Sequence, residues 1–348
     1  MSSEYFHNLH DKTKTRFWIN NPSGEDLKNA LTSGAINCTT NPAYCSKLIK
    51  SDQEYLHSII DEVIRETRDI EEAAILVYQK ASTRVMEAML PLYEESRGQC
   101  GFVTMQDDPR KDEQTEAVIE AAKRNRKLSK NFMAKIPVIK GGVEALKWCV
   151  AENIPICATE VFSISQAVYM CELYEQAVNA TGNQPPFFVT HITGIFDEYL
   201  KKTAKREGIE ISAEVLSQAG SAVGRKEYHM LKERGYHTVM LGGGARGLEH
   251  FTEFVGGDVH ITINWSTAWE LIEAGTPIVS RIDAETPQPV IDELSEKFPD
   301  FKKAYEDDGL PLEEFAAYGP VQLFRNSFLN GYHLLLAEIA ARRHFHAL

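Results

Sequence analysis

The chain has 348 residues, of which 43% are hydrophobic and 25% charged, and its formal net charge is −13. This composition excludes a disordered, collagen-like or small disulfide-bonded protein, and a chain of this length can bury a large core. An acidic surface repels phosphate backbones, so no nucleic-acid partner is expected. No apolar run approaches the ~20 residues that span a bilayer, and residues 1–20 carry no secretion signal. The sequence therefore predicts a soluble cytoplasmic protein that does not bind membranes.

The six cysteines form neither a CxxC pair nor a zinc-binding spacing. Three of them, Cys38, Cys100 and Cys157, lie in or beside apolar, strand-like runs. We therefore expect buried, reduced thiols, with a catalytic cysteine as the minority interpretation. No metal site is predicted.

Short runs rich in Val, Ile, Phe and Thr alternate with longer amphipathic segments, which is typical of parallel strands and their connecting helices. The predicted strands are 17–20, 35–39, 101–106, 132–138, 154–162, 187–193, 238–241 and 259–264. The predicted helices are 24–33, two or three within 52–95, 107–130, 141–152, 163–179, 213–234, 248–255, 267–274 and 327–343.

Eight strand–helix units in one chain favour an α/β fold with a single, closed (β/α)8 TIM barrel. The alternative is a doubly wound open sheet, but the glycine fingerprint of that fold should follow a first strand. Here the only glycine cluster, 242–247, follows the seventh strand. We predict a barrel over residues 1–280 and a C-terminal helical extension over residues 281–348, packed on the barrel.

One charged residue stands out in the fourth predicted strand. Lys135 lies inside the apolar run 132–138, where burial of an ammonium group costs free energy. Desolvation lowers the pKa of such an amine, and a neutral amine in a pocket forms a Schiff base with a carbonyl group. The other interpretation is a lysine that extends outward or pairs with a carboxylate. Taken alone, the run leaves both interpretations open.

Active-site groups of a TIM barrel lie at the carboxyl ends of its strands. Here these positions hold amides and hydroxyls, namely Asn20, Thr39 to Asn41, Gln106 and Thr159. Each of them alone more often caps a loop or a helix. Together they predict a polar, mostly uncharged pocket around Lys135, which suits the hydroxyls of a polyol and a water that carries protons.

Two of these motifs resemble those of the transaldolase family. Residues 39–42, Thr-Thr-Asn-Pro, resemble its second-strand signature, and residues 134–138, Ala-Lys-Ile-Pro-Val, resemble its Schiff-base strand. Similarity continues, in the same order, through residues 144–146, 156–167 and 241–246. The resemblance covers roughly 16–271. It implies a barrel of the class I aldolase type that transfers a three-carbon dihydroxyacetone unit between sugar phosphates.

The resemblance also implies a role for each matching residue. Lys135 would form the Schiff base, and Thr159 would hold the water that relays protons. Gln106 and Asn20 occupy the two remaining catalytic positions. The substrate-binding positions would be Asn41, Thr39, Thr190, Gly244 and Arg246, the last as a phosphate anchor.

The chain departs from the family pattern at several of these positions. Asn20 stands where the family has an aspartate, and Gln106 stands where transaldolases have a glutamate and fructose-6-phosphate aldolases a glutamine. Neither amide titrates near neutral pH, so neither can be the base. Cys157 replaces an asparagine, Ile195 takes the approximate place of a second phosphate-binding arginine, and Gly244 replaces a serine.

Other titratable residues near the strand ends could supply the missing base. Alternation along a strand predicts that Glu160 and His191 face the helix layer. Asp107 and Asp108 are expected to cap the helix that follows them. The glycines before Arg246 either form a tight turn or bring backbone N–H groups to an anion.

The sequence thus predicts a transaldolase-type transferase of carbohydrate metabolism, of the kind used in the pentose phosphate pathway. It would act on a small-molecule sugar or sugar phosphate by Schiff-base chemistry, with no cofactor and no metal. The alternatives are an aldolase that cleaves or forms a ketose without transfer, and a non-catalytic sugar-binding barrel. A nicotinamide oxidoreductase is disfavoured because no dinucleotide motif is present. Whether the chain forms a homo-oligomer is left open.

Overall fold

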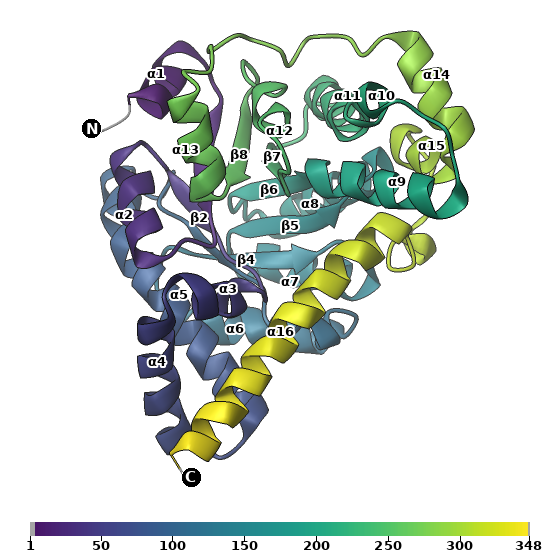
Figure 1. The fold of residues 1–348 in the computed structure, drawn as a ribbon. Helices are drawn as coiled ribbons and strands as arrows, with labels where there is room; N and C mark the ends of the chain where they lie inside the picture. Colours follow the sequence, from purple (N-terminus) through teal and green to yellow (C-terminus); the bar gives the residue numbers. More distant parts are fainter. Residues whose placement is uncertain (1–3, 347–348) are drawn as a thin grey trace.

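The computed structural model describes residues 4–346. Within them, eight parallel strands close into a barrel in the order β1 to β8 (Figure 1). The strands are β1 (Arg16–Asn20), β2 (Asn37–Thr39), β3 (Val103–Met105), β4 (Phe132–Pro137), β5 (Ile156–Val161), β6 (Phe187–Ile192), β7 (Val239–Gly243) and β8 (Val259–Ile263). The predicted TIM barrel is confirmed, and each predicted strand overlaps an observed one. The open-sheet alternative is wrong because β1 pairs with β8.

Helices follow the strands and form the outer layer of the barrel (Figure 1). The α-helices of the barrel are α1 (Tyr5–Lys12), α2 (Gly24–Thr32), α3 (Tyr44–Ser51), α4 (Gln53–Glu66), α5 (Ile70–Glu95), α6 (Thr115–Asn125), α7 (Lys140–Ala151), α8 (Ile164–Thr181), α9 (Thr193–Glu207), α10 (Ala213–Leu216), α11 (Ala219–Glu233), α12 (Glu249–Thr252) and α13 (Trp265–Glu273). The C-terminal part adds α14 (Gln288–Lys297), α15 (Pro299–Tyr305) and α16 (Gly319–Phe345).

Several helical segments differ from the prediction, and the helices α1 and α3 were not predicted. Helix α9 was missed, because it begins one residue after β6 and no side chain caps it, so no start signal is present. The single helix predicted at 213–234 is two helices, α10 and α11. The helix predicted at 107–130 is shorter: a 3-10 turn at Pro109–Lys111 precedes α6, which starts at Thr115.

The half of the barrel interior at the amino-terminal ends of the strands is filled by apolar side chains. The cluster consists of Trp18, Phe102, Met133, Cys157, Phe188 and Leu241, none of them more than 5% exposed. The rings of Trp18 and Phe188 meet edge to face with centroids 4.9 Å apart. This packing closes the barrel at the amino-terminal ends of the strands, so a ligand can enter the interior only from the carboxyl-terminal ends.

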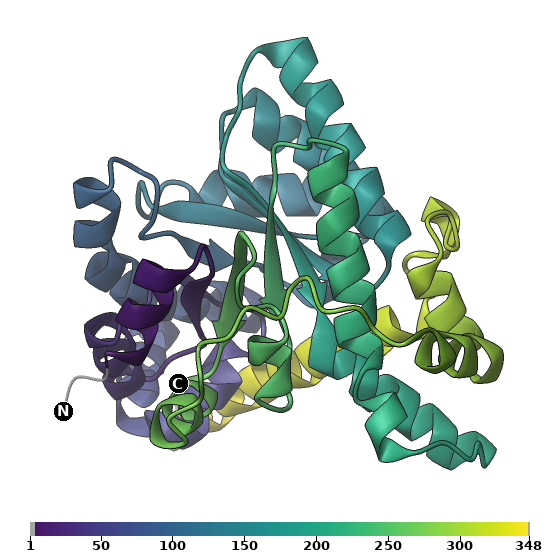
Figure 2. The ribbon, with the colours of Figure 1, turned by 90° about the horizontal axis from the view of Figure 1, so that it is seen from above.

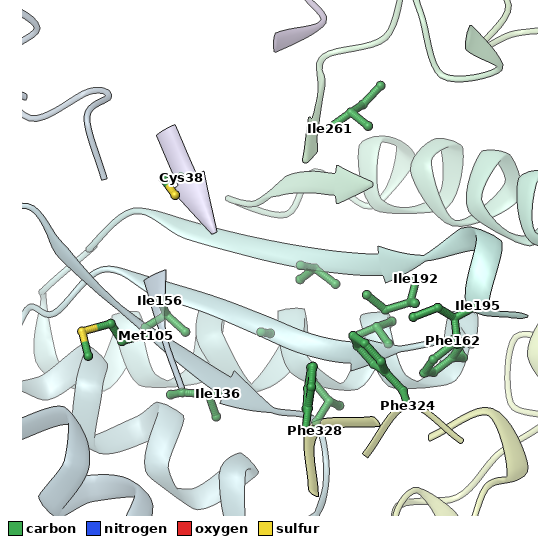
Figure 3. Packing of buried hydrophobic residues seen from close by; sticks show 14 of the residues in the cluster. Cys38, Met105, Ile136, Ile156, Phe162, Ile192, Ile195, Ile261, Phe324 and Phe328 are labelled. Atoms are coloured by element: carbon green, nitrogen blue, oxygen red, sulfur yellow. The ribbon is translucent and has the colours of Figure 1, made fainter. Parts of the chain in front are cut away.

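The chain after α13 crosses one side of the barrel in an extended segment and reaches α14 and α15 (Figure 2). Helix α16 then runs diagonally from α9 to α3 and α4 (Figure 1). Its side chains Phe324 and Phe328 lie near Phe162, Ile192 and Ile195 at the carboxyl ends of the strands (Figure 3). Helix α16 therefore covers part of the barrel mouth. A domain boundary at residue 280 stays a prediction.

No helix within residues 4–346 is long and apolar enough to cross a membrane.

Candidate active site

A cavity of about 210 Å³ lies at the carboxyl-terminal ends of the strands. Among its lining residues are Asn20, Thr39, Asn41, Lys47, Lys135, Thr159, Thr190, Gly244, Arg246, Asn264, Phe324 and Phe328. Every predicted site residue lines this cavity except Gln106. A larger cavity of about 1150 Å³ opens beside Phe102, Phe188 and His260, at the closed end of the barrel. It holds none of the predicted residues and lies at the end that TIM-barrel enzymes do not use.

Lys135 projects into the barrel from β4 and is only 7% exposed. Its Nζ lies 3.4 Å from the carbonyl oxygen of Thr40 and 5.6 Å from the ring centroid of Phe328. Burial lowers the pKa of the Lys135 amine, an effect that Cys157 and Glu160 oppose. The prediction of a buried lysine is confirmed, and the outward-pointing alternative is wrong.

Asn20 and Thr39 belong to a hydrogen-bond network on β1, β2 and β8. The Thr39 hydroxyl donates to Oδ1 of Asn20 at 3.0 Å and lies 2.6 Å from the hydroxyl of Thr262. The Asn20 side-chain N–H donates to Oδ1 of Asn264 at 3.0 Å. Asn20 therefore has defined partners on both sides, which fixes the wall of the cavity. Asn41, which is 8% exposed, accepts from the backbone N–H of Ala43 at 3.0 Å.

The wall on the other side of Lys135 comes from β5 and β6. Thr159 is fully buried, and its Oγ1 has no hydrogen-bond partner among the described residues. The Thr190 hydroxyl lies 3.2 Å from Sγ of Cys157. Burial raises the pKa of the Cys157 thiol, so this cysteine is a poor nucleophile at neutral pH. The cysteines are all free, and only Cys100 is partly exposed rather than buried.

The expectation that Glu160 faces the helix layer is wrong. Its φ of +68° is left-handed, and the register between β5 and β6 shifts between Ala158 and Val161. This bulge breaks the alternation of side chains on which the expectation rested. The side chain of Gln166 holds the bulge, because its Nε2 donates to the carbonyl oxygen of Glu160 at 3.0 Å. Left-handed conformations of non-glycine residues persist only where the surroundings fix them, and they cluster at functional sites.

Gln106 does not line the main cavity but joins two buried carboxyl groups. Its side-chain Nε2 donates to Oε1 of Glu160 at 3.2 Å and to Oδ2 of Asp112 at 3.1 Å. Glu160 is fully buried and Asp112 is 3% exposed. Burial raises the pKa of Glu160 to about 7, against the opposing influence of Arg325, Gln106 and Lys135. Burial and the charge of Glu160 raise the pKa of Asp112 as well.

Two cations lie at the mouth of the cavity. Arg246 follows β7, and its guanidinium Nε donates to Oε2 of Glu198 at 2.8 Å. Lys47, on α3, donates from Nζ to Oδ1 of Asn264 at 2.7 Å. Both residues are exposed to solvent, and both line the cavity that contains Lys135. The rim of the cavity thus carries two cationic side chains, of which Arg246 is paired with a carboxylate and Lys47 has a pKa that desolvation of its amine lowers to about 8.

The backbone N–H groups of Arg246 and Gly247 are not free for an anion. The N–H groups of Arg246 and Gly247 both donate to Nδ1 of His250, at 3.1 and 3.0 Å, and are already satisfied. Gly244 has a φ of +71°, and a Cβ there would lie 2.7 Å from Cγ2 of Ile192. The glycine run is therefore a tight turn, and a serine at Gly244 would be strained.

Three other expectations concern residues outside the cavity. His191 faces the helix layer as predicted, with Nδ1 2.9 Å from Oε2 of Glu227. Asp108 caps the 3-10 turn that follows it, as expected, by accepting from the N–H of Arg110 at 3.0 Å. Asp107 caps no helix start: it accepts from the side chain of Asn125 at 2.6 Å, at the far end of α6.

Sequence reasoning missed the residues that come from distant helices. Phe324 and Phe328 arrive on α16, and Lys47 arrives on α3. No local motif marks them, because their role depends on where each helix crosses the barrel. Asp112 was missed inside a segment interpreted as a charged helix. Among the described residues, no group of three or more His, Cys, Asp or Glu side chains could hold a metal ion.

The family model described as transaldolase/fructose-6-phosphate aldolase matches residues 17–314. Since that match covers most of the chain, the chain belongs to this family. It is similar to the transaldolase of Mycobacterium tuberculosis, with 25% identity over 234 residues, which is 62% of this chain and 61% of the relative. It is also 24% identical over 248 residues to the transaldolase of Neisseria meningitidis, covering 65% of this chain and 69% of the relative. The chain thus spans about three fifths of the mycobacterial relative's length.

Proposed function

We propose that this protein is a Schiff-base transaldolase, which moves a dihydroxyacetone unit from a ketose or ketose phosphate to an aldose acceptor. The observation that carries the proposal is the buried amine of Lys135 on the wall of a polar cavity at the barrel mouth, where burial lowers the pKa of the amine. A neutral, desolvated amine is the nucleophile that carbonyl chemistry of this type requires.

The reaction begins when Nζ of Lys135 attacks the ketone carbon C2 of the donor. Loss of water leaves an iminium group, which withdraws electrons from the C3–C4 bond. As that bond breaks, the C4 hydroxyl loses its proton and the fragment that begins at C4 leaves as an aldehyde. C1 to C3 remain on Lys135 as an enamine. Attack of the enamine on an acceptor aldehyde, followed by hydrolysis, completes the transfer. The hydroxyls and amides of Thr39, Asn41 and Thr190 lie where they can bind the hydroxyls of the sugar.

The donor is proposed to carry an anionic group at the end remote from C1. Arg246 and Lys47 both line the cavity, and a guanidinium group suits a phosphate through paired hydrogen bonds. Lys47 supplies a second positive charge on the cavity lining, to which Ile195 contributes only an apolar side chain. Glu198 holds Arg246 at present, so an incoming phosphate would compete with that carboxylate.

An aldolase that releases the enamine to water instead of passing it to an aldose is the second candidate. The apolar cover from Phe324 and Phe328 favours transfer, because excluding water from the mouth protects an enamine from protonation and hydrolysis.

The test is reductive trapping. Borohydride added with fructose 6-phosphate is expected to give a covalent mass adduct on Lys135, located by peptide mapping. A turnover assay with and without an aldose acceptor then separates transfer from simple cleavage. Absence of any adduct, with or without acceptor, would mean that the barrel binds sugars without catalysis.

A further inference from the structure

The proposed reaction needs a base that removes the proton from the C4 hydroxyl, and Asn20 and Gln106 cannot supply it. Asn20 and Gln106 occupy strand ends beside Lys135, and neither amide accepts a proton near neutral pH. A buried carboxyl group lies close by instead. Glu160 accepts a hydrogen bond from Gln106 at 3.2 Å. Because β4 separates β3 from β5 in the barrel, this contact spans the end of the strand that carries Lys135.

We propose that Glu160 is the proton-exchange group of this enzyme and that it works through a water held by Thr159. The inference rests on the proposed Schiff-base function. It assigns to the bulge of β5 a task that a regular strand could not perform, because regular alternation would turn Glu160 away from the barrel mouth.

The first line of support is a set of buried polar atoms that the protein leaves unpaired. Oγ1 of Thr159, Oε2 of Glu160 and Oε1 of Gln106 are buried and have no hydrogen-bond partner among the described residues. Buried polar atoms are nearly always satisfied by protein or by an ordered water, and such a water makes two to four hydrogen bonds. Thr159 and Glu160 are consecutive residues, and the Thr159 side chain lines the substrate cavity. A water bound there would connect the cavity with the carboxyl group.

The second line of support is the position of Lys135. It lines the substrate cavity and also a second cavity of about 240 Å³ that contains Gln106 and Asp112. Lys135 therefore borders both cavities. The charges of Glu160 and Asp112 both act on it, since each raises the pKa of Lys135 against the larger effect of burial.

The third line of support is the charge balance around Glu160. One N–H₂ group of Gln106 serves both Glu160 and Asp112, and two buried carboxylates this close do not both ionise readily. The surrounding charges are Arg325 on α16, Lys135 on β4, and Asp108, which acts on Asp112. Burial outweighs the cations and raises the pKa of Glu160 to about 7. Such a group can accept and return a proton at neutral pH.

Over one complete transfer, Glu160 takes up one proton and gives one proton back. As the C3–C4 bond breaks, its electron pair forms the C2=C3 bond of the enamine, and the C=N π pair moves to the nitrogen. The C4 hydroxyl proton passes to the water, and a proton of that water passes to the Glu160 carboxylate. The aldehyde then leaves. When the enamine attacks the acceptor aldehyde, the new alkoxide takes a proton from the water, and Glu160 returns its own proton to the water.

The test uses the full chain with fructose 6-phosphate and follows release of glyceraldehyde 3-phosphate. Glu160→Gln keeps the size of the side chain, and its amide can still pair with Gln106. We expect kcat to fall by about 10²- to 10⁴-fold, the usual contribution of a positioned base. The rise of kcat with pH near 7 should disappear. Borohydride should trap the uncleaved six-carbon adduct on Lys135 in place of the three-carbon adduct of the wild type.

A matched control is Glu227→Gln, which removes an equally buried carboxyl group that pairs with His191 in the helix layer. It should leave the pH profile and the six-to-three-carbon ratio unchanged. If Glu160→Gln keeps the wild-type kcat, pH profile and adduct ratio, the proposal is wrong although the Schiff-base function stands. If the wild type itself gives no adduct, the proposed function fails first.

A second variant tests the proposal even if Glu160→Gln does not fold. Arg325→Met removes the cation that lowers the pKa of Glu160, so the rise of kcat should move to higher pH. Glu113→Gln is its control, because it breaks the 2.9 Å ion pair between Glu113 and Arg325 but keeps the Arg325 charge. A rise that stays at the wild-type pH in Arg325→Met would overturn the proposal.

Discussion

The two ends of the barrel are built from the same strands but from opposite kinds of side chain. At the amino-terminal end, Trp18, Phe102 and Phe188 fill the interior and leave almost no exposed surface. At the carboxyl-terminal end, hydroxyls, amides and Lys135 surround a cavity. A single strand contributes to both: β4 supplies Met133 to the apolar cluster and Lys135 to the cavity.

The two ends also differ in how many buried polar atoms lack a partner: beside Phe102 at the closed end, Nδ2 of Asn37 is such an atom among the described residues. The indole N–H of Trp18 has a partner, because it donates to Nδ1 of His260 at 2.8 Å. Near the mouth, Thr159, Glu160 and Gln106 each keep an unpaired buried oxygen. The difference indicates that the closed end stabilises the barrel, while the mouth retains polar groups that a substrate or water can satisfy.

The largest effect on function should come from Lys135→Met. Methionine conserves the length and apolar character of the side chain, so β4 should still pack. Without the amine no Schiff base can form, so turnover and the borohydride adduct should both be lost. Circular dichroism and thermal melting should show an intact fold. Residual turnover above a few per cent would assign the nucleophile elsewhere.

The reciprocal change at the closed end is Trp18→Ala. Trp18 is fully buried, so its loss should lower the free energy of unfolding by about 3–5 kcal/mol, measured by urea denaturation. Molecules that remain folded should still form the Lys135 adduct. If the adduct were lost while the protein stays folded, the two ends would not be independent.

At the rim, Arg246→Ala should weaken kcat/KM for fructose 6-phosphate by roughly ten- to a hundredfold, because a hydrogen bond to a charged group contributes ~1.5–3 kcal/mol. The loss should be small for dihydroxyacetone, which carries no phosphate. Arg206→Ala is the control, since Arg206 lies on α9 outside the cavity and pairs with Glu207. Equal losses for both donors would mean that Arg246 serves only to hold Glu198.

The smallest effect is a gain in stability from Glu160→Gln. Burial raises the pKa of Glu160 from 4.5 to about 7, so the folded state disfavours the ionised form. Below 4.5 the group is protonated in both states and costs nothing. Between 4.5 and about 7 only the unfolded state ionises, so the cost to folding grows with pH and is complete above about 7. The variant should therefore be more stable than the wild type by on the order of 1 kcal/mol at pH 8, and the gain should vanish near pH 4. Denaturation at the two pH values measures it.

Much of this molecule follows from local pattern. The periodicity of short apolar runs predicted the strands, because parallel strands buried on both faces read as continuous apolar segments. Lys135 was identifiable because a charged residue inside such a run is costly to bury. Helix α9 was not identifiable, because it starts without a capping side chain directly after β6.

What the sequence by itself determined is the barrel and the polar residues at the strand ends, because both depend on the alternation and spacing of neighbours in the chain. It singled out Lys135, but only the tertiary structure shows that this side chain points inward. Only the tertiary structure decided which way Glu160 turns, since one bulge reverses the alternation on β5. It also decided which distant side chains complete the mouth. Phe328 lies over Lys135 because α16 crosses the barrel there, and long-range packing, rather than local sequence, fixes that crossing.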